Sequence, residues 1–202
     1  RGLALRFAVA GYRVLLGSRD LTRAQEVADS VRNSAHNLDI QGVMNDQAAH
    51  DAEIVLVTVP FEGHETLLKS VRGHLQGKIV VDTVVPLTFK RKFAESVPVS
   101  EGSASQQAQV LLPESHVVAA FQNVSAHDLL SLDHIIDGDV IVCGDNSEAK
   151  RSVMELAETI RDVRALDGGG LQNARYVEDL TVLFLNMNRI YKGRCMVKVV
   201  GI

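Results

Sequence analysis

The residues with the clearest chemistry are Gly17-Ser18-Arg19, which follow a short apolar run at 13–16. In a dinucleotide-binding βαβ unit, the residue after the second strand faces the adenosine ribose, and an acidic residue there favours NAD. A hydroxyl followed by arginine suits the 2′-phosphate of NADP, because Ser18 can donate a hydrogen bond and the Arg19 guanidinium is a permanently charged fork. Arg23, one helical turn on, can add a second cation. The sequence therefore predicts an NADP site, with exposed, unliganded arginines as the alternative.

Three other loops also follow apolar runs, at 58–61, 82–86 and 121–125. They are candidate binding loops, because ligands of open parallel sheets bind at the carboxyl ends of the strands. The competing interpretation of each is structural: a strand-to-helix turn, a plain loop or, for the histidine that follows the first loop, a solvent-facing side chain. The candidate residues are Val59, Pro60, Phe61, His64, Val84, Val85, Pro86, Asn123 and Ala126.

These loops must be positioned by strands and helices that alternate along the chain. The run at 53–60 is almost continuously apolar, as in a parallel strand covered on both faces, and Asp20 can cap the helix that follows it in sequence. Helices are predicted at 2–10, after Asp20, at 47–50, 62–75, from 103, and at 126–131, 147–162 and 171–191. Strands are predicted at 13–16, 41–44, 53–60, 78–82, 116–121, 139–143 and 196–200.

The alternation predicts an α/β fold, namely a Rossmann-like doubly wound parallel sheet with a smaller, mainly helical C-terminal unit. We place a dinucleotide-binding domain at 1–138. The smaller unit at 139–202 is expected to supply a substrate cleft. Its helix 171–191 has a broad apolar face, which suits burial against the sheet domain or a second subunit.

Composition excludes several classes of function. The 202 residues have a net charge of −4, and the longest basic run, Lys90-Arg91-Lys92, is interpreted as a solvated segment, so no nucleic-acid surface is expected. No apolar run approaches the ~18 residues of a membrane span. Cys143 and Cys195 lie outside any metal or redox spacing, which favours a cytoplasmic protein. No metal site is predicted.

Taken together, the motifs resemble those of the NADPH-dependent reductases of coenzyme F420, a deazaflavin hydride carrier. The resemblance covers essentially the whole chain. The matching segments are Gly2-Leu3-Ala4-Leu5-Arg6, Gly17-Ser18-Arg19, Thr58-Val59-Pro60-Phe61-Glu62, Val84-Val85-Pro86, Val142-Cys143-Gly144-Asp145, Leu166-Asp167-Gly168-Gly169 and Leu171-Gln172-Asn173-Ala174-Arg175.

This resemblance implies hydride transfer between NADP(H) and coenzyme F420, in a homodimer. It implies that the loops at 58–61 and 82–86 wall the nicotinamide, and that Asn123 and Ala126 contact the carboxamide or the deazaflavin. His64 would approach the diphosphate or the nicotinamide. Because the hydride passes directly between the two carriers, no catalytic side chain is predicted. The alternatives are an NADPH-dependent flavin or ferric reductase, and a non-catalytic NADP(H)-binding module.

One family feature is absent from the sequence. Members of the family begin with a strand and a G-x-G-x-x-G loop, and Arg1 corresponds to a position just after that loop. We expect the native protein to be longer by about 15 residues, one strand and its loop. The absent strand would lie between the strands at 13–16 and 53–59, so a break in the sheet is expected there.

Overall fold

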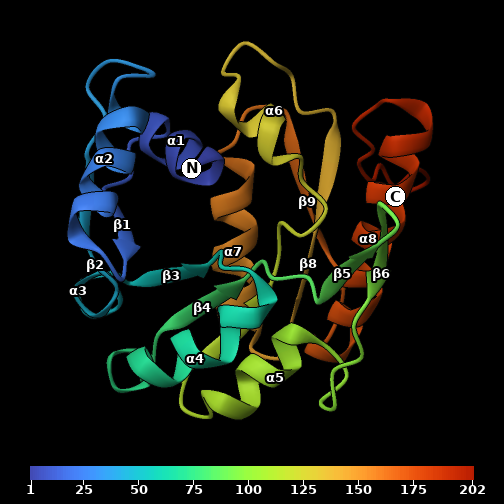
Figure 1. Ribbon diagram of the computed structural model, residues 1–202, viewed down its shortest axis with the longest axis horizontal. Helices are drawn as coiled ribbons and strands as arrows, with labels where there is room; N and C mark the ends of the chain where they lie inside the picture. Colours follow the sequence, from blue (N-terminus) through green and yellow to red (C-terminus); the bar gives the residue numbers. More distant parts are fainter.

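The computed structural model describes residues 1–202 as an α/β arrangement with helices on both faces of a central sheet (Figure 1). The strands are β1 (Val14–Ser18), β2 (Ile40–Met44), β3 (Ile54–Val57), β4 (Ile79–Asp82), β5 (Leu87–Lys90), β6 (Phe93–Ser96), β7 (His116–Ala119), β8 (Gly138–Gly144) and β9 (Val163–Asp167). The helices are α1 (Gly2–Val9), α2 (Leu21–Arg32), α3 (Asn45–Asp51), α4 (Phe61–Val71), α5 (Ala104–Leu111), α6 (Ala126–Leu130), α7 (Ser147–Glu158) and α8 (Ala174–Tyr191). Short 3₁₀ turns, η1 (Arg72–His74) and η2 (Leu171–Asn173), follow α4 and precede α8.

The central sheet has the order β3-β4-β7-β8-β9, and every pair in it is parallel except β7–β8. Neighbouring residues of β4 and β7 point to opposite faces, as the pleat requires. Val80 and Val117 pack against α4, α5 and α8, whereas Val81 and Val118 pack against α1 and α7. The doubly wound Rossmann-like class is therefore confirmed, but β8 and β9 run antiparallel to the other three strands, which the sequence did not indicate.

The sheet is broken where the sequence predicts. β1 pairs only with β2, in parallel, and β3 pairs only with β4, so β1 and β3 belong to two separate sheets (Figure 1). Each of these two strands has one edge without a strand partner. The residues at the carboxyl end of β1 are therefore positioned by β2, α2 and α3 rather than by the central sheet.

The β1–β2 unit is held together by α2. The Asp20 carboxylate accepts a hydrogen bond from the backbone N–H of Arg23 at 3.1 Å and begins the helix. Ala24 and Ala28 are buried against β2. Gly42 allows this close approach, because a Cβ there would lie 2.3 Å from the Ala24 backbone. The predicted Asp20 cap of this helix is confirmed.

Three strand assignments differ from prediction. β5 and β6 form an antiparallel hairpin in a stretch with no predicted strand, and β9 follows α7 where only a loop was expected. The predicted strand at 196–200 is wrong, since this segment has no strand pairing. It is fixed instead by isolated contacts, including the backbone N–H of Asp139 donating to the Val197 carbonyl at 2.7 Å.

Residues 139–202 extend the central sheet through β8 and β9 and add α7 and α8. The division at 138/139 remains a prediction. No helix is long and apolar enough to cross a membrane.

Candidate functional site

The carboxyl ends of β3, β4 and β7 are tied together around Asp82. The Thr83 hydroxyl donates to the Val57 carbonyl at 3.0 Å, which joins β3 to the loop after β4. The Asp82 carbonyl accepts from the Ala120 N–H at 3.2 Å and from the Gln122 side-chain amide at 2.9 Å. The three candidate loops therefore form one fixed edge.

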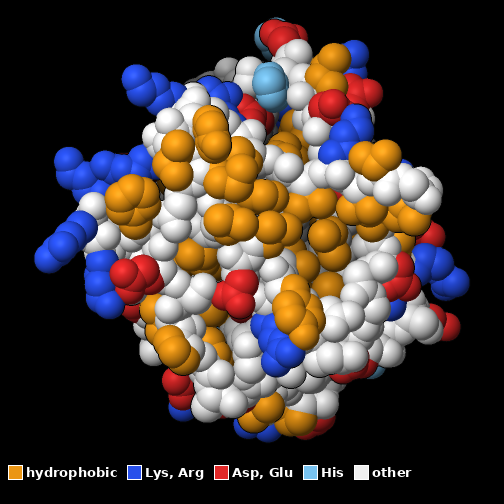
Figure 2. Space-filling model, turned by 90° about the vertical axis from the view of Figure 1, so that its right-hand side faces the viewer, with side chains coloured by type: hydrophobic (Ala, Val, Ile, Leu, Met, Phe, Trp, Pro, Cys, Tyr) orange, Lys and Arg blue, Asp and Glu red, His pale blue; other side chains and the backbone are white.

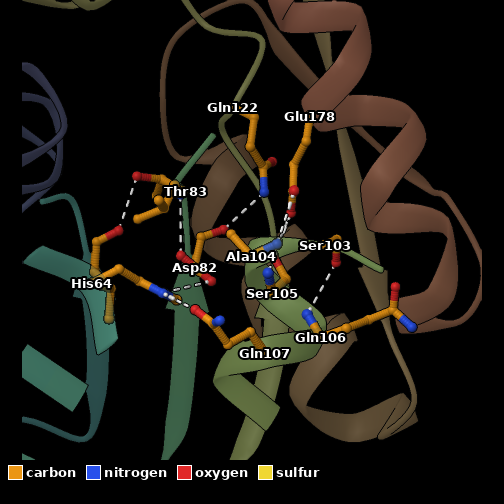
Figure 3. Close-up of polar contacts among 12 residues, drawn as sticks. His64, Asp82, Thr83, Ser103, Ala104, Ser105, Gln106, Gln107, Gln122 and Glu178 are labelled. Carbon is orange, nitrogen blue, oxygen red and sulfur yellow. Dashed lines mark hydrogen bonds and ion pairs between the residues drawn. The ribbon is translucent and has the colours of Figure 1, made fainter. Parts of the chain in front are cut away.

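Behind this edge, His64 and Asp82 form a buried polar pair (Figure 3). His64 Nε2 lies 3.1 Å from Asp82 Oδ2, and its Nδ1 lies 3.4 Å from the Gln107 side-chain oxygen. Both side chains are 0% exposed. Burial alone would lower the pKa of His64, but the hydrogen bond and charge of Asp82 outweigh it and raise the pKa. Asp82 Oδ1 accepts from the Val84 N–H, so the pair fixes the loop after β4.

A second buried carboxylate, Glu178 of α8, lies at the N-terminus of α5 (Figure 3). It accepts hydrogen bonds from the N–H groups of Ala104 and Ser105 at 3.0 and 3.3 Å, and from the Ser105 hydroxyl at 3.2 Å. Burial raises its pKa to about 7, although these hydrogen bonds act in the opposite direction. This contact joins α8 to the helix that supports Gln107.

A cavity of about 410 Å³ opens beside the loops after β3 and β4. It brings together three predicted residues, Pro60, Phe61 and Val85. The rest of the lining comes from residues that the sequence analysis did not select, namely Glu62, Leu87, Thr88 and Phe89. The walls are mainly apolar, which suits a flat ring that must react away from water.

The predicted NADP residues lie on the separate β1–β2 sheet and α2: Ser18 is the last residue of β1, and Arg19 and Arg23 follow it. Ser18 is half-buried, and its Oγ accepts from the Asp20 N–H at 3.2 Å, which leaves its own proton free to donate. Arg19 and Arg23 are exposed and form no ion pair. The nearest acidic residue in sequence, Asp20, is engaged as the cap of α2. A hydroxyl donor and an uncompensated guanidinium are thus available to an anion.

The remaining predicted residues are placed as follows. His64, Val84, Pro86 and Asn123 are buried, Val59 is half-buried, and Ala126 is exposed at the start of α6. His64 faces Asp82 rather than the cavity.

The amide oxygens of Gln122 and Asn123 are buried without a hydrogen-bond partner. These acceptors lie just after Phe121, which has a left-handed backbone (φ 69°). The loop after β7 therefore combines a strained backbone position with two buried oxygens that can still accept hydrogen bonds.

The sequence alone does not indicate four residues of the site, Phe89, Gln107, Gln122 and Glu178. The hairpin residues had a weak signal, because Leu87 and Phe89 alternate with polar residues. The others are ordinary polar residues whose positions depend on packing between distant segments.

The fold and edge define a class, the Rossmann-like oxidoreductases that use nicotinamide dinucleotides. Residues 1–86 match the family described as NADP oxidoreductase coenzyme F420-dependent. The F420-dependent NADP reductase of Methanothermobacter thermautotrophicus is 39% identical over 193 residues, which cover 93% of this chain and 83% of the relative. The chain therefore belongs to the F420-dependent NADP reductase family.

Two further similarities concern other proteins. The metalloreductase STEAP3 of Rattus norvegicus is 32% identical over 92% of this chain, but the match covers only 35% of that protein. A crystal structure of an Arthrobacter sp. FB24 protein assigned as an F420-dependent NADP reductase superposes with a TM-score of 0.84. That match covers 100% of this chain and 96% of the other, at 22% identity, and supports the fold alone.

Proposed function

We propose that this chain transfers a hydride between NADP(H) and the deazaflavin coenzyme F420. The proposal is supported by two features that occur together in this chain, which belongs to the F420-dependent NADP reductase family. A free hydroxyl–arginine pair follows β1, and a mainly apolar cavity lies at the ends of β3 and β4. The first fits an anionic ribose phosphate, and the second fits a planar ring.

On the nucleotide side, Ser18 and Arg19 hold the 2′-phosphate, with Arg23 as a second cation. Pro60, Phe61 and Val85 wall the nicotinamide, while Val59, Val84 and Pro86 support that wall. Asn123 and Ala126 lie at the next strand end, where the free Asn123 oxygen is an acceptor for an amide. The buried His64–Asp82 pair acts as a positioning device, since it fixes the Val84 N–H and contacts no cavity.

Hydride transfer between the two carriers needs alignment and exclusion of water more than acid–base groups. Holding two reactants in alignment is worth about 7–11 kcal/mol of the barrier. The protein supplies this alignment through the rigid edge formed by Val57, Asp82 and Gln122. The apolar lining of the cavity removes water from the reacting rings.

The second candidate, a flavin or ferric reductase, is favoured by the similarity to STEAP3. A non-catalytic nucleotide-binding module is the third. An absorbance assay separates them, using NADPH with F420, with free flavin or with a ferric chelate. We expect oxidation of NADPH with F420. Turnover with only the flavin or the chelate would favour the second candidate, and tight binding without any turnover the third.

We also propose a homodimer formed through α8. Tyr176, Leu183 and Ile190 are 58%, 53% and 62% exposed and lie seven residues apart, so they form one stripe along the helix. The stripe lies opposite the buried side that carries Val177 and Val182. Figure 2, which faces the α8 side of the molecule, displays a broad apolar area near its centre. A second copy of the same helix is a self-complementary partner for this stripe.

We place the protein in the cytoplasm, where Cys143 and Cys195 would remain the free thiols seen here. Cell fractionation checks this location, and recovery in a membrane or secreted fraction would contradict it.

A further inference from the structure

The β5–β6 hairpin places a basic tip at the mouth of the cavity. Thr88 and Phe89 line the cavity, and the chain then turns through Arg91 and Lys92, both with left-handed backbone (φ 48° and 81°). A strand rises about 3.3 Å per residue, so Arg91 lies about 7 Å along the chain from Phe89. The sequence analysis had interpreted Lys90-Arg91-Lys92 only as a solvated segment.

Most of the charge at this tip is uncompensated. Lys90 pairs with Glu95 across the hairpin at 2.8 Å, but Arg91 and Lys92 form no ion pair. Arg189, from the end of α8, donates to the Lys92 carbonyl at 2.9 Å and lies 5.4 Å from the centre of the Phe93 ring. It has no acidic partner either. Three cationic residues without an acidic partner, from the hairpin turn and the end of α8, therefore lie at this tip of a protein with net charge −4.

The tip is held in place by α8. The Asn186 side chain exchanges two hydrogen bonds with the Ala94 backbone, at 2.7 and 2.9 Å. The Ser96 hydroxyl donates to Asp179 at 2.6 Å. The hairpin is thus fixed beside the cavity, and Figure 2 displays basic side chains projecting from one edge of this side of the molecule.

Acidic and basic residues lie at different places around the cavity. Glu62, from the start of α4, also lines the cavity and disfavours an anion beside it. Coenzyme F420 joins a flat deazaflavin ring to a phosphodiester and a chain of glutamates, so its tail is a flexible polyanion. The predicted site for the other anion, the NADP 2′-phosphate, lies on the separate β1–α2 segment.

We propose that the hairpin tip, with Arg91, Lys92 and Arg189, binds the anionic tail of the deazaflavin coenzyme, while Phe89 contacts its ring. This inference rests on the proposed function. The tip is a recognition site and takes no part in hydride transfer. It selects the complete coenzyme over a deazaflavin that lacks the phosphodiester and glutamates.

Fluorescence titration without NADPH tests the proposal with two ligands, coenzyme F420 and the tailless deazaflavin that keeps only the ring and its ribityl chain. The unaltered chain should bind F420 more tightly, and added salt should remove much of the difference. The charge reversal Arg91→Glu/Lys92→Glu should raise the Kd for F420 about tenfold and leave the tailless ligand unchanged. The matched control, Arg151→Glu in α7 with Arg161→Glu in the turn that follows it, should change neither value.

The outcomes are distinguishable. Equal affinity of the unaltered chain for both ligands, or no effect of salt on F420 binding, would overturn this inference while leaving the proposed function in place. An equal weakening of both ligands by the charge reversal would also overturn it. If the unaltered chain bound neither ligand, the proposed function would fail together with the inference.

Discussion

We propose that Arg19 carries the preference for NADP over NAD. Its guanidinium is exposed and unpaired, beside a serine hydroxyl whose proton is free. NADP and NAD differ only at the 2′-phosphate. The proposed specificity therefore depends on a few atoms at the end of β1.

We expect Arg19→Asp to raise the KM for NADPH about 10- to 100-fold, because a hydrogen bond to a charged group is worth about 1.5–3 kcal/mol. The KM for NADH should change little. Steady-state kinetics with both nucleotides checks this, and Arg151→Asp at an exposed position of α7 is the matched control. Equal changes for NADPH and NADH would refute the assignment.

At the scale of elements, the sequence predicted most of the fold and only part of the site. The run at 53–60 and the Asp20 cap are local signals, so β3 and α2 followed from them. β9 and the β5–β6 hairpin have weak local signals and form through contacts with β8 and with α8, which are distant in sequence. For the same reason, only part of the cavity lining was predicted. Pro60, Phe61 and Val85 follow strong strands, whereas Phe89 comes from the hairpin.

The contact between α8 and α5 makes folding stability depend on pH. Glu178 has an ordinary pKa of 4.5 and a pKa of about 7 in the folded protein. The folded state binds this proton more tightly than the unfolded state. The protonated Glu178 carboxyl therefore adds to the free energy of unfolding below pH 4.5, and this stabilisation is lost as pH rises towards 7. The loss amounts to about 3 kcal/mol.

We therefore expect the unaltered protein to lose stability relative to Glu178→Gln as pH rises from about 4.5 to 7. Glutamine has the same shape and keeps an oxygen that can accept from Ala104, but it does not titrate. Denaturant unfolding across this pH range measures the difference. Parallel pH profiles for the two proteins would show that Glu178 does not titrate there.

At the scale of the whole molecule, the two proposed ligands and the proposed partner subunit use different surfaces. The proposed nucleotide site lies on the β1–α2 segment, the cavity lies at the central sheet edge, and the proposed dimer stripe lies on the outer side of α8. Glu178, on the inner side of the same helix, contacts α5, which supplies Gln107 to the buried network behind the cavity. Thus α8 connects the subunit surface to the site.

Light scattering of the unaltered chain should give twice the 22.0 kDa mass of one chain. Leu183→Glu/Ile190→Glu should produce monomers, because each dimer would bury four carboxylates in an apolar contact. The substitution pair Glu148→Lys/Glu155→Lys on α7 serves as the control and should remain dimeric. A monomer for the unaltered chain would remove the dimer proposal.

Direct hydride transfer between NADP(H) and F420 can be followed with an isotope label. NADPH carrying deuterium at C4 of the nicotinamide is mixed with F420 and the protein, and the reduced deazaflavin is analysed by mass spectrometry. We expect deuterium from one face of the nicotinamide to appear in the reduced deazaflavin, even in ordinary water. Loss of the label to solvent, or no reduction of F420 at all, would contradict it.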